Sequence, residues 1–204
     1  MSEANFALGE YHRYFSCACG IEYIVSKYEK IFISSNIWFN SSKYILHFGY
    51  TSVHTNKTMN IALGSDHAGV EYKKVISDML RSEGLGVLDF GTMTTDSVDY
   101  PDFAVAVASC VANNDATFGI LLCGSGIGVS ITANKVAGIR AANCVTVEMA
   151  KLSKMHNNAN VLTLGTRIVS LDDAILIVRA FLETPFEGGR HSNRVEKIHS
   201  LTNC

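Results

Sequence analysis

The stretch Ile120–Ser130, I-L-L-C-G-S-G-I-G-V-S, combines a thiol with a glycine-rich turn. Cys123 stands where an apolar run ends and the turn Gly124–Gly128 begins. Glycines let the backbone approach a ligand and point successive N–H groups at it, which suits a phosphate or an oxyanion. A helix N-terminus favours the thiolate form of a neighbouring cysteine, so Cys123 could act as a nucleophile or a base. The alternative is a buried packing residue.

The glycine spacing argues against a nicotinamide-dinucleotide site. Such a site needs G-x-G-x-x-G after a strand and an acidic residue about 20 positions further on. Here Gly124, Gly126 and Gly128 are spaced G-x-G-x-G, Val129 fills the place of the third glycine, and the next expected strand ends in Asn143. A turn that binds a phosphate or an oxyanion therefore fits better, although a non-catalytic phosphate- or nucleotide-binding module stays open.

Asp66 and His67 follow the first expected strand, in Gly64-Ser65-Asp66-His67. Ligands of a doubly wound sheet bind beyond the carboxyl ends of the strands, where the strand order reverses. With the common order 2-1-3-4-5, this crevice lies between strands one and three and brings Asp66 and His67 to Cys123. Each also has a structural alternative: Asp66 could cap the following helix, and His67 could face solvent.

Five further polar residues could contribute to a site. His156 and Asn157 close a predicted helix, where compensation of the helix dipole and capping are the simpler explanations. Arg190 and Arg194 are four residues apart on one helix face, so they form either a solvated charged face or a forked phosphate grip. Arg167 follows the last expected strand and lies on the ligand side of the sheet.

Apolar strands alternate with amphipathic helices from Met59 onward, which implies parallel βαβ crossovers. The expected fold is α/β: a Rossmann-like, doubly wound, five-stranded parallel sheet in three αβα layers. Pro101 suits a helix start, and Ser170 with Asp173 makes a capping box. The expected strands are 59–64, 87–90, 119–122, 138–143 and 160–165, and the expected helices are 71–81, 103–111, 129–136, 147–156, 171–182 and 193–201.

Composition describes a soluble globular protein with one full core: 204 residues, 48% hydrophobic, 18% charged, with a net charge of −2. Without a long basic run, nucleic acid is a poor partner. The sequence contains no uninterrupted apolar window of about 18 residues, so it predicts no membrane span. The six cysteines are too scattered for a disulfide framework, and the C-x-C of Cys17 and Cys19 is a weak zinc signal. A reducing, cytoplasmic compartment and no metal are expected.

Residues 1–58 differ from residues 59–204 in amino-acid composition, and their apolar residues follow no clear helical or strand period. Charged residues such as Glu22 and Lys27 interrupt the apolar stretch that a signal peptide would need. We expect residues 1–58 to form a poorly ordered or weakly docked extension, or to precede the true start at Met59.

Seven motifs, in order, make residues 59–204 resemble the ribose-5-phosphate isomerase B family, whose wider group includes sugar-phosphate isomerases that act on six-carbon substrates. Residues 1–58 have no counterpart in that family. The motifs are G-S-D-H-A-G (64–69), D-Y-P-D-F (99–103), C-G-S-G-I-G (123–128), A-N-K-x-x-G-I-R-A (133–141), H-N-x-A-N-V-L (156–162), L-G-T-R (164–167) and G-G-R-H-x-x-R-V (188–195).

The resemblance implies an aldose–ketose isomerase that interconverts ribose 5-phosphate and ribulose 5-phosphate through a cis-enediolate, in the non-oxidative pentose phosphate pathway. An isomerase of allose or galactose 6-phosphate is the alternative within the family. The resemblance also implies that no cofactor is needed. It implies a homodimer, or a dimer of such dimers, in which the partner subunit completes the crevice.

The roles of single residues are likewise carried over from the resemblance. Cys123 is the base that moves the proton between C2 and C1, because Val129 and Ser130 stand where some relatives have a glutamate. His156 opens the sugar ring, and Asp66 assists at the sugar oxygens. The remaining roles are oxyanion stabilisation by Ser125, Gly124, Gly126 and Gly128, substrate contact by Tyr100 and Asn157, and phosphate contact by His67, Arg167, Arg190 and Arg194.

Overall fold

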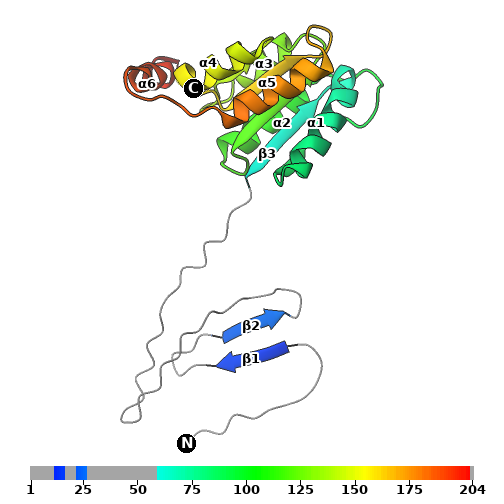
Figure 1. Ribbon diagram of the computed structural model, residues 1–204, viewed down its shortest axis with the longest axis vertical. Coiled ribbons are helices and arrows are strands. Elements are labelled where there is room, and N and C mark those ends of the chain that lie inside the picture. Colours follow the sequence, from blue (N-terminus) through cyan, green and yellow to red (C-terminus); the bar gives the residue numbers. More distant parts are fainter. Residues whose placement is uncertain (1–11, 17–21, 27–58, 203–204) are drawn as a thin grey trace, which may run out of the picture. The chain divides into compact units, whose positions relative to one another are not determined.

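The computed structural model describes residues 12–16, 22–26 and 59–202 of the chain. The chain divides into two compact units, Met1–Val53 and His54–Cys204. In the first unit, β1 (His12–Ser16) pairs antiparallel with β2 (Glu22–Ser26) (Figure 1). The expectation that residues 1–58 form an extension or precede the true start stays a prediction, because most of this segment, with Cys17 and Cys19, lies outside the described residues.

The second unit is built on a five-stranded, fully parallel sheet in the order β4-β3-β5-β7-β6. When the five strands are numbered by their order along the chain, their order across the sheet is 2-1-3-5-4. The expected order 2-1-3-4-5 was therefore wrong at its last two positions. The last strand takes the inner place because all its residues are buried, whereas the fourth has three partly buried residues. The strands are β3 (Asn60–Ser65), β4 (Gly86–Asp89), β5 (Phe118–Cys123), β6 (Ala141–Asn143) and β7 (Val161–Gly165).

Helices cover both faces of this sheet, which confirms the three-layer αβα fold (Figure 1). One face packs against α1, α4 and α5, and the other against α2 and α3. The last helix, α6, packs beside α4. The helices are the 3₁₀ turn η1 (His67–Gly69), α1 (Val70–Ser82), α2 (Tyr100–Ala112), α3 (Ile127–Ala133), α4 (Val147–Asn157), α5 (Leu171–Glu183) and α6 (Arg190–Thr202).

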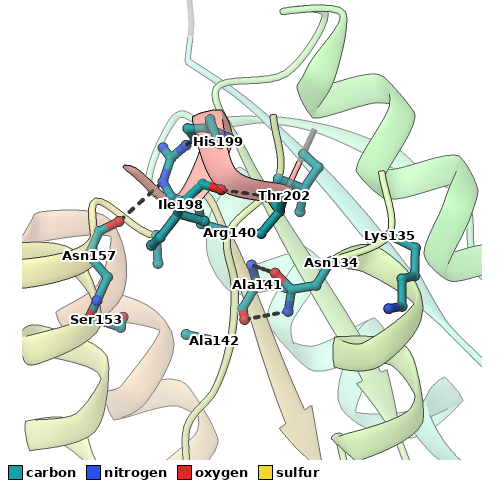
Figure 2. Close-up of a pocket in the computed structure, with 12 residues that line it drawn as sticks. Asn134, Lys135, Arg140, Ala141, Ala142, Ser153, Asn157, Ile198, His199 and Thr202 are labelled. Atoms are coloured by element: carbon teal, nitrogen blue, oxygen red, sulfur yellow. Dashed lines mark hydrogen bonds between the residues drawn. The ribbon is translucent and has the colours of Figure 1, made fainter. Parts of the chain in front are cut away.

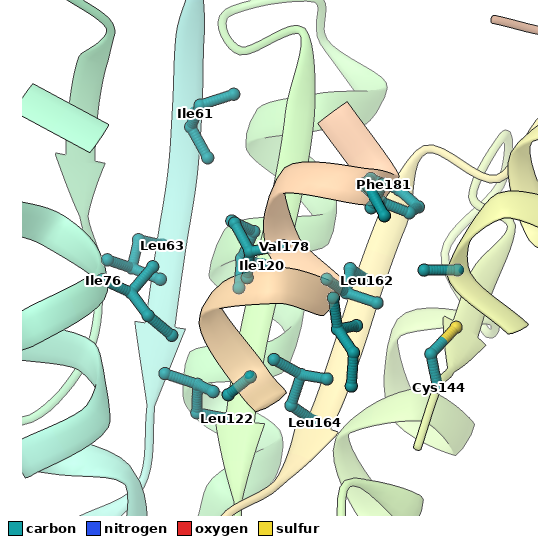
Figure 3. Close-up of a cluster of buried hydrophobic side chains, with 14 of the residues drawn as sticks. Ile61, Leu63, Ile76, Ile120, Leu122, Cys144, Leu162, Leu164, Val178 and Phe181 are labelled. Carbon is teal, nitrogen blue, oxygen red and sulfur yellow. The ribbon is translucent and has the colours of Figure 1, made fainter. Parts of the chain in front are cut away.

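Alternation along the central strands divides the core into two layers. Figure 3 shows Ile120 and Leu122 of β5 beside Leu162 of β7, under Phe181 of α5. The intervening residues point to the opposite face, and there Cys123 belongs to the cluster that packs against α2 and α3. The thiol is therefore directed towards the α2–α3 side of the sheet.

Local signals explain where several elements begin. The expected cap of α5 is confirmed: the Ser170 hydroxyl accepts the Asp173 N–H at 3.1 Å. Several expected boundaries were wrong, and two of the differences have a visible backbone cause. β6 begins at Ala141 rather than residue 138, because Gly138 has a φ of +81° and belongs to a turn. α6 begins at Arg190 rather than residue 193, directly after two glycines with positive φ. Among the described residues, no helix has the length and hydropathy to cross a membrane.

Candidate active site

The carboxyl ends of β3 and β5 lie side by side, as the topology predicted. Ser65, the last residue of β3, lies opposite Leu122 of β5. The next backbone N–H, that of Asp66, donates to the Leu122 carbonyl at 3.2 Å. Asp66 and Cys123 thus leave the sheet from adjacent strands at the same edge, and both side chains are buried.

The Cys123 thiol sits inside the glycine turn rather than beside it. Its sulfur accepts the Gly126 N–H at 3.1 Å, and the side chain is 4% exposed. The Cys123 carbonyl accepts the Thr166 N–H at 2.9 Å, which ties the end of β5 to the segment after β7. The turn therefore holds the sulfur of Cys123, and the segment after β7 holds its backbone carbonyl.

Two glycines of the turn are required by close packing. Gly126 has a φ of +75°, and a Cβ there would strike the Asn143 side chain and lie 2.9 Å from the Gly165 nitrogen. A Cβ at Gly128 would lie 2.7 Å from Cε2 and 2.9 Å from the hydroxyl of Tyr100. The Tyr100 ring therefore lies directly against the turn.

Asp66 and His67 both have structural partners. Oδ1 of Asp66 accepts the Ala68 N–H at 2.9 Å, so Asp66 caps η1, the structural alternative that the sequence offered. Nδ1 of His67 accepts the Val98 N–H at 3.3 Å. A neutral His67 ring in this arrangement carries its proton on Nε2. Capping by one oxygen leaves Oδ2 of Asp66 as a further acceptor at the crevice.

Arg167 brings a positive charge to the same edge. Its backbone N–H donates to the Gly124 carbonyl at 3.0 Å. A Cβ at Gly124 would lie 3.4 Å from Cζ, Nε and Nη1 of Arg167, so the guanidinium packs over the glycine turn. The structure thus brings together at this edge Cys123, Asp66, His67, Tyr100, Gly124, Ser125, Gly126, Gly128 and Arg167. We call this set the carboxyl-edge group.

The other candidates lie at the opposite edge. Val161, at the start of β7, pairs with Gly119, whereas Gly165 at its end pairs with Cys123. Four residues of parallel strand span about 13 Å. His156 and Asn157 end α4 just before β7 begins, so they lie at the amino edge. The structure does not bring them to Cys123 within one chain.

His156 instead meets residues of α6 and the segment before it. Its ring stacks on that of His191, with centroids 4.4 Å apart and planes 8° from parallel. Nε2 of His156 and Nε2 of His191 lie 3.8 and 3.7 Å from the same Oε2 of Glu187. Burial, followed by the charges of His156, Arg190 and Arg194, lowers the pKa of His191, while Glu187 opposes this shift. We call His156, Asn157, Glu187, Arg190, His191 and Arg194 the amino-edge group.

Arg140 supports this group and was missed from the sequence. Its guanidinium donates to the carbonyls of Asn157 at 3.1 Å and Asn158 at 2.7 Å, and it contacts Nε2 of His199 at 2.8 Å. It thereby holds the C-terminal end of α4. Figure 2 shows Arg140 between Asn157 and His199, beside a cavity of about 490 Å³. The sequence signal that could have indicated Arg140 is its place in the motif A-N-K-x-x-G-I-R-A.

The fold and the site together define a class: a Rossmann-like α/β protein with a buried thiol in an N–H-lined turn at its switch point. Residues 61–198 match the model of the Ribose/Galactose Isomerase family. The chain belongs to this family.

Relatives and solved structures are similar over the same region. Ribose-5-phosphate isomerase B of Escherichia coli is 47% identical over 141 residues, which cover 69% of this chain and 95% of that protein. A ribose-5-phosphate isomerase B structure from Clostridium thermocellum is 50% identical with a TM-score of 0.70, covering 71% of this chain and 98% of that one. The Mycoplasma genitalium structure, with bound ribulose-5-phosphate, is 45% identical with a TM-score of 0.69, covering 71% and 97%.

Proposed function

We propose that this protein interconverts ribose 5-phosphate and ribulose 5-phosphate as an aldose–ketose isomerase, through a cis-enediolate. The observation that carries the proposal is the Cys123 sulfur, which is held by the Gly126 N–H in the crevice between β3 and β5. Family membership supports it, as do the similar proteins named ribose-5-phosphate isomerase B, one of them holding ribulose-5-phosphate.

Cys123 is the base in this proposal. Its thiolate takes the proton from C2 of the open-chain aldose and returns it to C1 of the enediolate. The hydrogen bond from the Gly126 N–H fixes the position of the sulfur in the turn. Since the Gly126 N–H is directed at sulfur, the amides of Gly124 and Gly128 and the Ser125 hydroxyl are left to stabilise the developing oxyanion.

Ring opening and phosphate binding fall to the amino-edge group. His156 donates a proton to the ring oxygen, and Arg190 and Arg194 bind the phosphate as a forked pair. Asp66, Tyr100 and Asn157 contact the sugar, and His67 and Arg167 add charge near its phosphate. No metal or organic cofactor takes part in this scheme, because acid–base groups suffice for an enediolate step.

A homodimer reconciles these roles with the geometry. One chain places its base and its ring-opening histidine at opposite edges of the sheet. A two-fold axis can set the amino-edge group of one copy against the carboxyl-edge group of the other. Exposed apolar side chains on α3 and α4 support such a contact: Ile127 and Ile131 on α3, where the glycine turn leads into that helix, and Met149 and Leu152 on α4. The unpaired thiols Cys110, Cys123 and Cys144 fit the reducing cytoplasm.

A direct assay tests the proposal. The full chain is incubated with ribose 5-phosphate, and ribulose 5-phosphate is measured against parallel reactions with allose 6-phosphate and galactose 6-phosphate. We expect kcat/KM to be highest for ribose 5-phosphate. A higher value for a six-carbon substrate would assign the alternative within the family. Binding of phosphate compounds without turnover of any sugar would assign a non-catalytic module.

A further inference from the structure

His156, Glu187 and His191 form a compact set of potential metal ligands, which we call the histidine–glutamate cluster. One ligand atom from each residue lies within 4.8 Å of the other two. Both imidazole Nε2 atoms lie near a single carboxylate oxygen, Oε2 of Glu187, at 3.8 and 3.7 Å. Among the residues that the structure describes, this is the one set of three that meets these distances.

The backbone holds the cluster in place before any ligand binds. The Glu187 N–H donates to the Met155 carbonyl at 3.1 Å, directly beside His156. Gly188 and Gly189 have φ of +66° and +56°, and they turn the chain back on itself. The His191 N–H then donates to the Gly188 carbonyl at 3.0 Å. Ordering of the ligands is therefore largely complete in the free protein.

The distances are close to those of a tetrahedral metal site. Zinc bonds to nitrogen and oxygen of about 2.1 Å place neighbouring ligand atoms about 3.4 Å apart. Both nitrogen–oxygen separations are a few tenths of an ångström longer. The stacked rings must tilt for their lone pairs to converge. His156 and Glu187 can supply that movement, since their side chains are 37% and 46% exposed, whereas His191 is buried.

Two histidines and one glutamate with an open fourth position are a donor set that suits zinc. We propose that the histidine–glutamate cluster binds a divalent transition-metal ion such as Zn²⁺, and that the bound ion inhibits the isomerase by occupying the His156 imidazole. The inhibitory part rests on the proposed function, in which His156 opens the sugar ring. Arg190 and Arg194 stand nearby and repel a cation, so we expect weaker binding than at a structural zinc site.

Metal binding is tested first, in a protein without the Cys123 thiol, and variants of the cluster separate its zinc from zinc held by other cysteines. The full chain carrying Cys123→Ala is titrated with Zn²⁺ by calorimetry and with Co²⁺ by visible absorption. The same titrations are repeated with Glu187→Gln or His191→Asn added. Glu183→Gln, an exposed glutamate four residues earlier, is the matched control. We expect the cluster to bind one Zn²⁺ per chain in the Cys123→Ala protein. This Zn²⁺ should be lost when Glu187→Gln or His191→Asn is added and retained when Glu183→Gln is added.

Imidazole NMR identifies the ligands independently of stoichiometry and of activity. Of the seven histidines, we expect Zn²⁺ to shift the Nε2 signals of His156 and His191. If His191→Asn fails to fold, Glu187→Gln alone decides, because Glu187 lies on the surface. Equal zinc stoichiometry in Glu187→Gln and Glu183→Gln, or unshifted His156 and His191 signals, would overturn the site.

Inhibition is measured separately, in the protein with Cys123 intact. The ratio of ribose 5-phosphate turnover with Zn²⁺ to turnover with a chelator is compared among the wild type, Glu187→Gln and Glu183→Gln. We expect at least about a tenfold higher Zn²⁺ concentration for half-inhibition of Glu187→Gln, as for the loss of a second-sphere or direct ligand contact. Equal inhibition of all three would refute the inhibitory role. Zinc binding in a protein without turnover would leave the metal site standing and would reject the proposed function.

Discussion

The two edges of the parallel sheet hold functional groups of opposite construction. At the carboxyl edge, backbone dominates: Cys123 is buried, and a turn N–H is directed at its sulfur. At the amino edge, side chains dominate: His156 stacks on His191, and the exposed Arg190 stands beside them. Strand register fixes the position of the carboxyl-edge group. The end of α4 and the beginning of α6 fix the position of the amino-edge group.

This difference separates the two kinds of chemistry. A proton-transferring base benefits from a buried, rigid position, because water and motion weaken its alignment. Binding a phosphate from solution instead benefits from exposed, long side chains with several donors. In the proposed scheme a single chain carries one of each, at opposite edges. Substitutions that inactivate each group in turn, followed by mixing of the inactive variants, therefore test the comparison.

Loss of the base should have the largest effect. We expect Cys123→Ala to lower kcat by about 10³-fold or more, because a positioned general base contributes about 10²–10⁴-fold. KM for ribose 5-phosphate should change little, since the proposal assigns phosphate binding to the amino-edge group. Steady-state kinetics measures both. Cys110→Ala, which removes a different buried thiol, is the control and should retain turnover within a few-fold. Near-normal turnover of Cys123→Ala would exclude Cys123 as the base.

Mixing two inactive chains should restore activity. Cys123→Ala breaks the carboxyl edge and His156→Asn breaks the amino edge. After equal amounts are unfolded and refolded together, a two-fold dimer with shared sites gives about one quarter of wild-type activity, because half of the dimers hold one intact site of two. Refolding each variant alone is the control. If the mixture is no more active than its components, both groups of a site come from one chain or act elsewhere.

The arginines of α6 should affect binding more than chemistry. We expect Arg190→Ala or Arg194→Ala to raise KM for ribose 5-phosphate by roughly 10–100-fold, in line with the loss of a charge-assisted hydrogen bond. The effect on kcat should be smaller. Lys197→Ala removes an exposed charge from the same helix and is the matched control. A fall in kcat at constant KM would show that the arginines do not hold the ground-state phosphate.

Two glycine substitutions separate the energetic cost of backbone strain from the cost of a steric collision in the glycine turn. Gly126→Ala meets the Asn143 side chain, whereas Gly84, with a φ of +81°, has open space around its Cβ position. We expect Gly84→Ala to lower the free energy of unfolding by about 1 kcal/mol from backbone strain alone. Gly126→Ala should lower it by about 3 kcal/mol, because the collision adds to the strain. Urea unfolding measures both, and equal losses would show that the turn relaxes around the methyl group.

The smallest effect concerns pH. Burial, and then the charge of Arg140, lowers the pKa of Lys154 from 10.5 to about 8. Its ammonium lies 3.9 Å from the Phe118 ring centroid and donates to the Ala159 carbonyl at 3.2 Å. Between pH 8 and 10.5 the unfolded chain holds a proton that the native chain has released, so the free energy of unfolding rises with pH.

Lys154→Met should remove this rise. At pH 7 the variant should be within about 1 kcal/mol of the wild type, because a methionine fills the same volume without a buried charge. The stability difference between wild type and variant should then shift towards the wild type from pH 8 to pH 10, as urea unfolding at both values would show. Lys151→Met, an exposed lysine on the same helix, should show no such trend. A pH-independent difference for Lys154→Met would contradict the lowered pKa.

Much of the fold could be predicted from the sequence because its signals are local. Apolar runs and helical spacing located the five strands of the parallel sheet and the six α-helices, and Ser170 located the start of α5. The order of β6 and β7 could not be read this way, since it depends on which strand is buried on both faces. The start of α6 was missed because the positive φ of Gly188 and Gly189 is a property of the turn rather than of the helix pattern.

The sequence by itself determined the parallel sheet, the meeting of its first and third strands, and the carboxyl-edge residues at strand ends and in the glycine turn. These follow from short-range features, whereas Tyr100 was selected only by the family resemblance. Only the tertiary structure decided that His156 stacks on His191 beside Glu187, that Arg140 holds the end of α4, and that both lie at the edge opposite Cys123. Such contacts join segments up to 59 residues apart, and helix packing rather than local pattern sets them.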